Sequence, residues 1–335
     1  MVKRVAIFSV AAILLCLVAN VGIAVEEQYV LKIGSITPET HPYYLTFKDV
    51  FVPYIEEHAG GRIKIEFYFN SELGGDREMV EMCQYGALGM DCATPSTITG
   101  FDKRFQVMGL PYLFKDKETA YRLLDGELGS TFNSFLPKIN LYNLGYFENG
   151  FRHVTNNRKP IYTPEDMKGL KIRTQENPIH IAFFRAVGAN PTPMNWGELY
   201  TALQQGTVDA QENPLVLIEE ARFYEVQKYV SLTGHVYEPT MLVTSKAWFD
   251  KLPEDLQEVV KEASRRFCEA ERRLISEEEK VARANLEEKG MKCNELTPEQ
   301  IDAFVKIGAK LYDDIRKIVG DDELVDNVIQ WTADN

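Results

Sequence analysis

The chain has 335 residues and a formal net charge of −13 at pH 7, from 50 acidic and 37 basic side chains. Such an acidic chain is a poor candidate for binding nucleic acid or anionic lipid, because their phosphates repel it. A local cationic pocket for a small anion remains compatible with this balance. The length exceeds what one hydrophobic core usually supports, so we expect two lobes.

The first 24 residues have the pattern of a secretory signal peptide. Two basic residues precede an almost wholly apolar run over residues 5–18, and small residues follow, so we expect cleavage near Ala24. The run has about 14 residues, which is short of the roughly 20 that span a bilayer. An uncleaved N-terminal anchor is the alternative. Cleavage would remove two positive charges and no negative ones, which changes the net formal charge to −15.

Four cysteines remain after the predicted cleavage site: Cys83, Cys92, Cys268 and Cys293. Export would permit disulfides, but we favour free thiols. No pair of cysteines, and no cysteine with a histidine, has the spacing typical of a zinc site. We therefore expect neither a metal nor a cofactor.

The first part of the mature chain alternates strands with helices. Strands are predicted over residues 29–36, 62–69 and 90–93, and helices over residues 43–58 and 78–85. In the second of these strands, isoleucine and phenylalanine alternate with charged residues, which is the period of a half-buried strand. The rhythm predicts an α/β lobe.

A second lobe is predicted to begin near residues 146–152. Its pattern contains strands over residues 170–174 and 208–210, each followed by polar residues. Helices are predicted over residues 179–187 and 196–205. Arg173 and Asn213 thus fall at the carboxyl ends of predicted strands, which is where ligands bind in open α/β sheets.

One long helix is predicted over residues 253–289, which contain no glycine and no proline after the first residue. At 1.5 Å per residue it would extend about 50 Å, more than one small lobe requires. A helix that braces both lobes explains this length better than a coiled coil, because no heptad pattern persists. A further helix is predicted over residues 298–318.

Arg173 is the most informative single residue. It follows Leu170 and Ile172 in a short apolar strand, so its permanent charge is expected against the sheet. A buried guanidinium needs an anionic partner, and its planar fork matches a carboxylate through two parallel hydrogen bonds. The partner is a bound ligand unless Glu212 or Asp209 of the chain itself pairs with it.

Several long motifs occur in a fixed order along the mature chain. They are Glu148–Asn156, Asp166–Arg173, Gly188–Met194, Leu203–Pro214 and Phe223–Lys228, with the shorter Leu73–Arg77 and Leu252–Leu256. In these motifs the chain resembles the substrate-binding proteins of tripartite ATP-independent periplasmic (TRAP) transporters, the DctP-like family.

The resemblance implies an α/β, two-lobe periplasmic-binding-protein (clamshell) fold with a long helix that spans both lobes. Lobe I is expected to contain residues 28–149 and about 239–278, and lobe II residues 150–238 and about 279–335. The expected protein is a periplasmic monomer that binds a small organic acid and docks on the integral membrane subunits of a TRAP permease. No catalytic residue is expected.

By position in the family motifs, Arg173 pairs with the substrate carboxylate, Arg152 assists it, and Asn213 contacts the same end of the ligand. Arg152 has the alternative role of supporting the sheet, and Asn213 that of bonding its own loop. Further candidates for the pocket are His41, Thr94, Ser96, Glu176, Asn177 and Trp196.

This mixture of polar groups favours a hydroxylated monocarboxylate such as a sugar acid. The alternatives are a C4-dicarboxylate, with His41 or Arg77 at its second carboxylate, and a keto or aromatic acid stacked on Trp196. An exported hydrolase with paired carboxylates is a remote alternative. The chain lacks the Gly-x-Ser-x-Gly, His-Glu-x-x-His, P-loop and Gly-x-Gly-x-x-Gly motifs of common enzyme classes.

Overall fold

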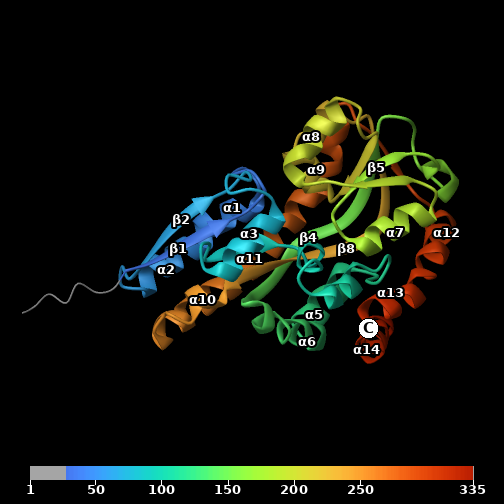
Figure 1. Ribbon diagram of the computed structural model, residues 1–335. Helices are drawn as coiled ribbons and strands as arrows, with labels where there is room; N and C mark the ends of the chain where they lie inside the picture. The colour runs from blue at the N-terminus through green and yellow to red at the C-terminus, as the bar shows by residue number, and fades with distance from the viewer. Residues whose placement is uncertain (1–27, 335) are drawn as a thin grey trace, which may run out of the picture.

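The computed structural model describes residues 28–334, so the predicted signal peptide and its cleavage site near Ala24 lie outside the described residues. Within this range, no helix has the length and apolar character that crossing a membrane requires. The strands form one nine-stranded sheet in the order β2-β1-β3-β8-β4-β7-β5-β6, with β9 also beside β8. Helices cover this sheet in two lobes, as Figure 1 shows.

The sheet is continuous because two long antiparallel strands, β4 and β8, run through both lobes. The strands are β1 (Tyr29–Gly34), β2 (Ile63–Tyr68), β3 (Met90–Ala93), β4 (Leu141–Asn156), β5 (Lys171–Thr174), β6 (Asn190–Pro193), β7 (Ala210–Asn213), β8 (Tyr229–Ser245) and β9 (Lys292–Glu295). In the first lobe β3 pairs with the end of β8 at residues 241–244. In the second lobe β7 pairs with the end of β4 at residues 153–156.

The chain before β4 contains β1 to β3 and a series of helices. These are α1 (Pro42–Thr46), the π-helical η1 (Phe47–Phe51), α2 (Val52–His58), α3 (Asp76–Tyr85), α4 (Pro95–Ile98), η2 (Lys103–Gly109), α5 (Lys117–Leu124), α6 (Glu127–Asn133) and η3 (Leu136–Ile139). The predicted strands are confirmed to within two residues at each end. The predicted helix over residues 43–58 is the uninterrupted run of α1, η1 and α2.

The remaining helices follow β4. They are η4 (Pro164–Met167), α7 (Pro178–Ala186), α8 (Trp196–Gln204), α9 (Leu215–Glu220), η5 (Phe223–Glu225), α10 (Lys246–Phe249), α11 (Glu254–Glu288), α12 (Pro298–Gly308), α13 (Leu311–Val319) and α14 (Asp322–Ala333). The side chain of Asn195 caps α8 by accepting a hydrogen bond from the backbone N–H of Gly197 at 3.0 Å.

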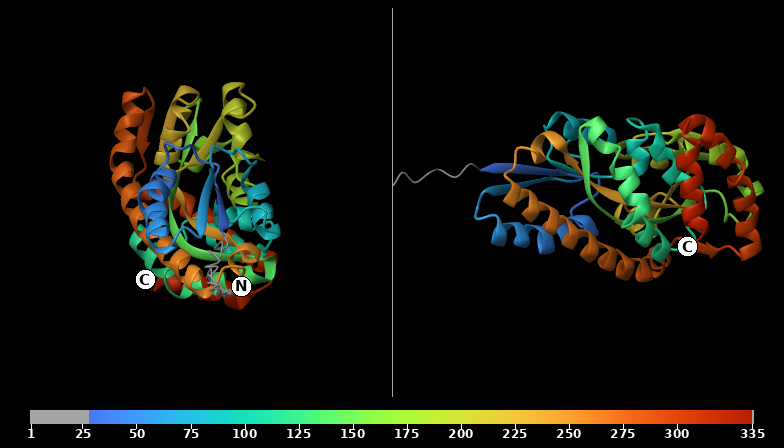
Figure 2. Two further views of the ribbon diagram at one scale, coloured as in Figure 1. Left: turned by 90° about the vertical axis from the view of Figure 1, so that its left-hand side faces the viewer. Right: turned by 90° about the horizontal axis from the view of Figure 1, so that it is seen from below.

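The long helix α11 has 35 residues and packs on both lobes. Its first half contributes Leu256, Val260 and Phe267 to the apolar core beneath β1 and α1. Its second half contributes Ile275 and Leu286 to the core around α8 and α9. Figure 2 shows it extending along the molecule from one lobe to the other. The predicted brace between the lobes is therefore confirmed.

The prediction of a single helix over residues 298–318 is wrong, because the chain forms α12 and α13 with a turn between them. The turn lets Phe304 of α12 and Ile315 of α13 enter the same core. Gly308 lies before the turn, where an added Cβ would be 3.1 Å from Pro111. The predicted strand at residues 208–210 is also misplaced, since β7 begins at Ala210.

All four cysteines of the described region are free thiols. Cys83, Cys92 and Cys268 are buried, and Cys293 is partly buried. Burial raises the pKa of the Cys92 and Cys268 thiols, so both are protonated at neutral pH.

Candidate functional site

Two adjoining cavities lie between the lobes, and both are lined by Asp76, Arg173, Gln175 and Trp196. Asp76 comes from the first turn of α3 in the first lobe, whereas Arg173 lies in β5 of the second lobe. Both lobes therefore contribute charged groups to one region of the cleft. This region is the candidate site.

Arg173 is 3% exposed, and in residues 28–334 it has no carboxylate within 4.0 Å. Its Nε and Nη2 atoms both donate to the backbone carbonyl of Met194, at 3.0 and 2.8 Å. Since a guanidinium has five N–H donors, three remain. Burial lowers the pKa of Arg173 to about 10, so the side chain is still charged at neutral pH. The site thus contains a buried cation without an anionic partner in the protein.

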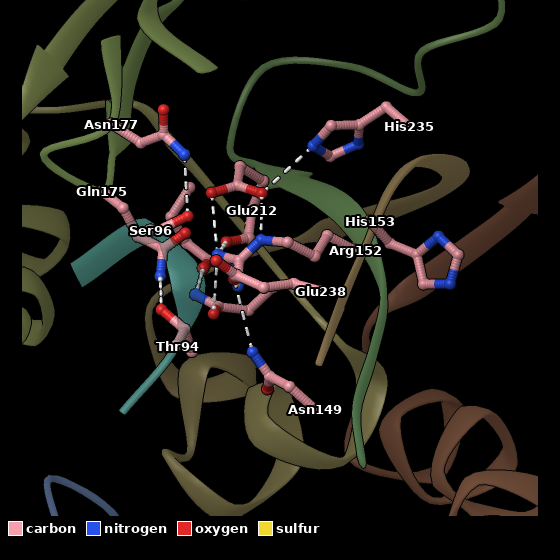
Figure 3. A network of polar contacts seen from close by, with 12 residues as sticks. Thr94, Ser96, Asn149, Arg152, His153, Gln175, Asn177, Glu212, His235 and Glu238 are labelled. Carbon is pink, nitrogen blue, oxygen red and sulfur yellow. Dashed lines mark hydrogen bonds and ion pairs between the residues drawn. The ribbon is translucent and has the colours of Figure 1, made fainter. Parts of the chain in front are cut away.

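Arg152 has partners at every nitrogen, as Figure 3 shows. Its Nε donates to Glu212 Oε2 at 2.6 Å, its Nη1 to Glu238 Oε2 at 2.7 Å, and its Nη2 to Glu212 Oε1 at 2.8 Å. Nη2 also lies 3.0 Å from Asn213 Oδ1, which accepts from it. Arg152 is 1% exposed and still lines the second cavity. It joins β4, β7 and β8 beneath the site.

Glu212 is the carboxylate that holds Arg152 most closely. Burial alone would raise its pKa, but Arg152 and the side chain of His235 outweigh burial and hold the pKa of Glu212 well below its usual range. His235 Nε2 lies 3.1 Å from Glu212 Oε2. Glu212, which lies with Arg152 beneath the site, is therefore charged at neutral pH.

Asn213 ends β7 and lines the second cavity. Its Nδ2 donates to Gln211 Oε1 at 2.5 Å, while its Oδ1 accepts from Arg152. The structure therefore brings Arg173, Arg152 and Asn213 into the wall of one cavity, as predicted from three separate motifs. Whether each contacts the ligand stays a prediction.

Hydrogen bonds cross the cleft beside the cavities. Gln175 Nε2 donates to Thr94 Oγ1 at 3.4 Å, and Asn177 Nδ2 donates to Ser96 Oγ at 2.8 Å. Figure 3 shows both pairs next to the Arg152 network. The lobes are therefore in contact across the cleft, and the cleft is closed.

The other predicted pocket residues divide into two groups. Thr94 lines the second cavity, Ser96 and Glu176 line the first, and Trp196 lines both. The Arg173 guanidinium lies 6.0 Å from the Trp196 ring. Neither His41 nor Asn177 lines either cavity.

His41 and Asn177 instead cap helices. His41 Nδ1 accepts from the backbone N–H of Tyr43 at the start of α1, at 3.3 Å. Burial lowers the pKa of His41 to about 3, so it is neutral and offers no charge to a second carboxylate. Asn177 Oδ1 accepts from the backbone N–H of Ile179 at the start of α7, at 3.0 Å.

Sequence reasoning missed several residues that line the cavities, among them Asp76, Gln175, Tyr43, Asn149 and Thr240. Gln175 follows Arg173 by two residues, which placed it at the same strand exit as the predicted Glu176. Asp76 had no such signal, because an acidic residue in the first turn of a helix is common for reasons of helix polarity alone.

Among residues 28–334, no group of three or more His, Cys, Asp or Glu side chains has a geometry that could hold a metal ion.

Comparison with known proteins agrees with this geometry. The model of the family DctP, described as bacterial extracellular solute-binding protein, family 7, matches residues 33–317. The 2,3-diketo-L-gulonate-binding periplasmic protein YiaO of Escherichia coli is 35% identical over 261 residues, which are 78% of this chain and 79% of that protein.

Two solved structures show the same fold. The sugar acid binding protein DctPAm of Advenella mimigardefordensis, in complex with galactonate, has a TM-score of 0.89 and 30% identity over 92% of this chain and 99% of that one. A TRAP periplasmic solute-binding protein of Sulfurospirillum deleyianum with bound succinate has a TM-score of 0.85 and 32% identity over 90% and 98%. Proteins of this family bind solutes and are not enzymes. The chain therefore belongs to the DctP family of bacterial extracellular solute-binding proteins, the periplasmic binding proteins of TRAP transporters.

Proposed function

We propose that this chain captures a hydroxylated monocarboxylate, such as a sugar acid, between its lobes and delivers it to the integral membrane subunits of a TRAP permease. The observation that carries the proposal is Arg173, a buried cation with free N–H donors at the cleft and no carboxylate partner among the described residues. An anion is needed to balance such a charge. The N–H groups match a carboxylate.

The other groups around the cleft support the hydroxylated part of the ligand. Thr94, Asn149, Asn213 and Thr240 line the second cavity and are neutral donors or acceptors. The structural neighbour from Advenella mimigardefordensis holds galactonate, and the relative from Escherichia coli is named for a diketogulonate. Galactonate and diketogulonate are both sugar acids with one carboxylate.

A C4-dicarboxylate is the second candidate, because the neighbour from Sulfurospirillum deleyianum holds succinate. Arg77 lines the first cavity and is the cation that could take a second carboxylate there. In the proposed cycle the protein acts as a periplasmic monomer after cleavage near Ala24. Its two lobes are residues 28–149 with about 239–278, and residues 150–238 with about 279–335.

A thermal-shift panel tests the proposal. The mature protein is mixed with D-galactonate, D-erythronate, succinate and neutral D-galactose. At a hundredfold excess over Kd, a ligand adds about 2.7 kcal/mol to the free energy of unfolding. We expect stabilisation by at least one hydroxylated monocarboxylate and none by galactose. A response to galactose alone would mean that Arg173 does not select a carboxylate.

A further inference from the structure

A third cavity adjoins the two cavities of the candidate site. It measures about 600 Å³, and it shares Ile36 and Trp196 with the second of them. Its wall also contains residues of the loops after β1 and β2 and residues from α8 to η5, so segments of both lobes enclose it. We call it the outer cavity, and we call the two cavities of the site the inner cavities.

The inner cavities are small. They measure about 50 and 30 Å³, whereas pockets that hold small-molecule ligands usually measure about 300–1,000 Å³. The volume of the outer cavity lies within that range. The inner cavities therefore suit the carboxylate end of a ligand, and space for a larger distal group lies in the outer cavity.

Aromatic rings form one wall of the outer cavity. Trp196 and Tyr200 line it and are partly buried, and the buried Phe223 lies behind them, with ring centroids 5.5 and 6.5 Å from theirs. Such rings offer a large apolar surface, which suits the C–H face of a sugar ring. The Arg173 guanidinium lies 6.0 Å from the Trp196 ring, so a ligand of two sugar units is long enough to contact both Arg173 and this wall.

The charged side chains that line the outer cavity already have partners. Glu220 Oε2 accepts from Thr40 Oγ1 at 2.5 Å, and Glu225 Oε2 accepts from the Tyr200 hydroxyl at 2.6 Å. Arg222 donates to Glu225 Oε1. Two carboxylates and one guanidinium give the lining a net negative charge, so this cavity favours a neutral hydroxylated group over a second anion.

The backbone on both sides of the outer cavity has a conformation that is uncommon for residues with a side chain. Asn70, Ser71 and Arg222 have φ angles of 55–58°, and they are three of the five non-glycine residues with positive φ in residues 28–334. The backbone N–H groups of Asn70 and Ser71 donate to the carbonyls of Thr37 and Ser35 at 2.8 and 3.2 Å, which fixes this loop beside β1. Backbone of this kind persists where its surroundings hold it, and it is concentrated at ligand sites.

We infer that the outer cavity is a second subsite for the same ligand, and that it takes a neutral hydroxylated ring attached to the acid that Arg173 holds. The inference rests on the proposed function, because it takes Arg173 as the carboxylate site. The substrate class is then a sugar acid that carries a further sugar unit. Its acid end occupies the inner cavities, its chain passes Ile36 and Trp196, and its distal ring packs on Trp196 and Tyr200.

Isothermal titration calorimetry with D-gluconate, lactobionate and lactose tests the inference. Lactobionate is gluconate that carries a galactose unit, whereas lactose has two sugar units and no carboxylate. The protein is expressed with its own N-terminus and purified after export. We expect lactobionate to bind at least about tenfold more tightly than gluconate, which corresponds to about 1.4 kcal/mol, and lactose not to bind detectably.

Tyr200→Ala should remove the advantage of lactobionate. Tyr200 lines the outer cavity and neither inner cavity, so the affinity for gluconate should stay within about threefold of the original. Tyr200→Phe keeps the ring and loses only the bond to Glu225, so it should keep most of the advantage. Tyr162→Ala is the matched control and should change neither affinity, because Tyr162 is an exposed tyrosine that lines none of the three cavities.

Gly197→Trp tests the same subsite without removing any packing. Gly197 lines the outer cavity, and the nearest atom to a Cβ built on it is Asn195 Oδ1 at 3.8 Å, so a side chain has room at its base. The added ring should narrow the outer cavity and lower the affinity for lactobionate alone.

Each outcome decides one claim. Binding of gluconate without tighter binding of lactobionate overturns the inference and leaves the proposed function standing. An equal loss of both affinities in Tyr200→Ala also overturns it, because a general effect on the fold would lower both. Lactose that binds as tightly as lactobionate overturns the link between the subsite and Arg173.

The thermal-shift panel separates the two proposals when neither gluconate nor lactobionate binds. If another acid of the panel stabilises the protein, the inference fails and the proposed function stands. If no acid does so, both fail.

Discussion

The side-chain amide of Asn195 fills the space beside Gly75 that any other residue at position 75 would need. A Cβ atom built on Gly75 would lie 2.1 Å from Asn195 Nδ2 and 2.7 Å from its Oδ1. Gly75 precedes α3 in the first lobe, and Asn195 caps α8 in the second. The cleft can therefore close in this way only because residue 75 is a glycine and has no Cβ atom.

Gly75→Ala should impair ligand binding by preventing full closure. Asn195 cannot move aside freely, because its Oδ1 caps α8. Since a ligand favours closure only through contacts made in the closed state, we expect affinity to fall at least about tenfold, with an unfolding cost of about 1 kcal/mol or less from the altered N-cap. Isothermal titration calorimetry measures the affinity, and small-angle X-ray scattering with and without ligand measures the extent of closure.

Gly197→Ala provides the control for that experiment. A Cβ at Gly197 would lie 3.8 Å from Asn195 Oδ1, which is ordinary contact, so affinity should be unchanged. The double variant Gly75→Ala with Asn195→Ala should recover part of the lost affinity. Normal affinity in Gly75→Ala alone would show that the lobes close less tightly than described.

Arg173→Met should abolish carboxylate binding while leaving the fold intact. Loss of the charged partner of a buried ligand carboxylate costs about 2–5 kcal/mol of binding free energy. The substitution breaks no ion pair within residues 28–334 and removes a buried charge, so the free energy of unfolding should stay level or rise. Calorimetry with the best ligand of the panel and urea unfolding give the two values. Binding within threefold of the original would remove Arg173 from the site.

Arg152→Met should have the opposite effect on stability, which makes it the matched partner of the previous variant. Glu212 and Glu238 are both buried and both pair with Arg152. Breaking such a network from one side leaves uncompensated carboxylates and costs about 3–5 kcal/mol. Urea unfolding of both variants tests the contrast, and equal stabilities would contradict the assigned division of roles.

Two buried carboxyl groups should contribute more to stability at pH 5 than at pH 8, whereas the buried neutral His41, His153 and His180, whose pKa values burial lowers, should contribute less. Asp91 is 0% exposed, neither carboxylate oxygen has a hydrogen-bond partner, and burial raises the pKa of Asp91 well above its usual value. Burial raises the pKa of Glu271 in the same way. Each of these two carboxyl groups therefore holds, in the folded state, a proton that the unfolded state has released above about pH 4. Its contribution to the unfolding free energy falls as pH rises, by up to about 1.4 kcal/mol per pH unit.

Asp91→Asn should lower the unfolding free energy at pH 5 relative to that at pH 8, because the amide does not titrate and the contribution of Asp91 is lost. Urea unfolding at pH 5 and pH 8 measures the difference for each protein, and Glu39→Gln on the exposed surface is the control. Below about pH 4 every one of these proteins should lose stability as pH falls, since Glu212 has a lowered pKa and loses its pairing when protonated. An unchanged pH 5 to pH 8 difference in Asp91→Asn would show that Asp91 is not the titrating group.

Local patterns predicted the elements that form the walls of the site. The alternation in β2 and the uninterrupted helical run of α11 are properties of contiguous residues, and both were confirmed. Arg173 was predicted for a physical reason, because a cation in an apolar strand needs a partner. The structure adds that no carboxylate of the described residues provides one.

The residues that sequence reasoning missed depend on contacts between distant segments. Asp76 faces Arg173 only because the two lobes close on each other, and no local pattern records that approach. The same holds for Glu238, whose pairing with Arg152 joins residues 86 positions apart. The turn between α12 and α13 was missed because no proline and no pair of glycines marks it in the sequence.

The sharing of α11 between the lobes has a consequence for how the chain can be made. The core beneath β1 and α1 includes Leu256, Val260 and Phe267, so the segment that begins the chain cannot bury its apolar face until α11 has been synthesised. A fragment ending at Ser245 would leave that face open to water. Folding of the first lobe must therefore wait for late segments, and an exported chain can cross the membrane before either lobe has a complete interior.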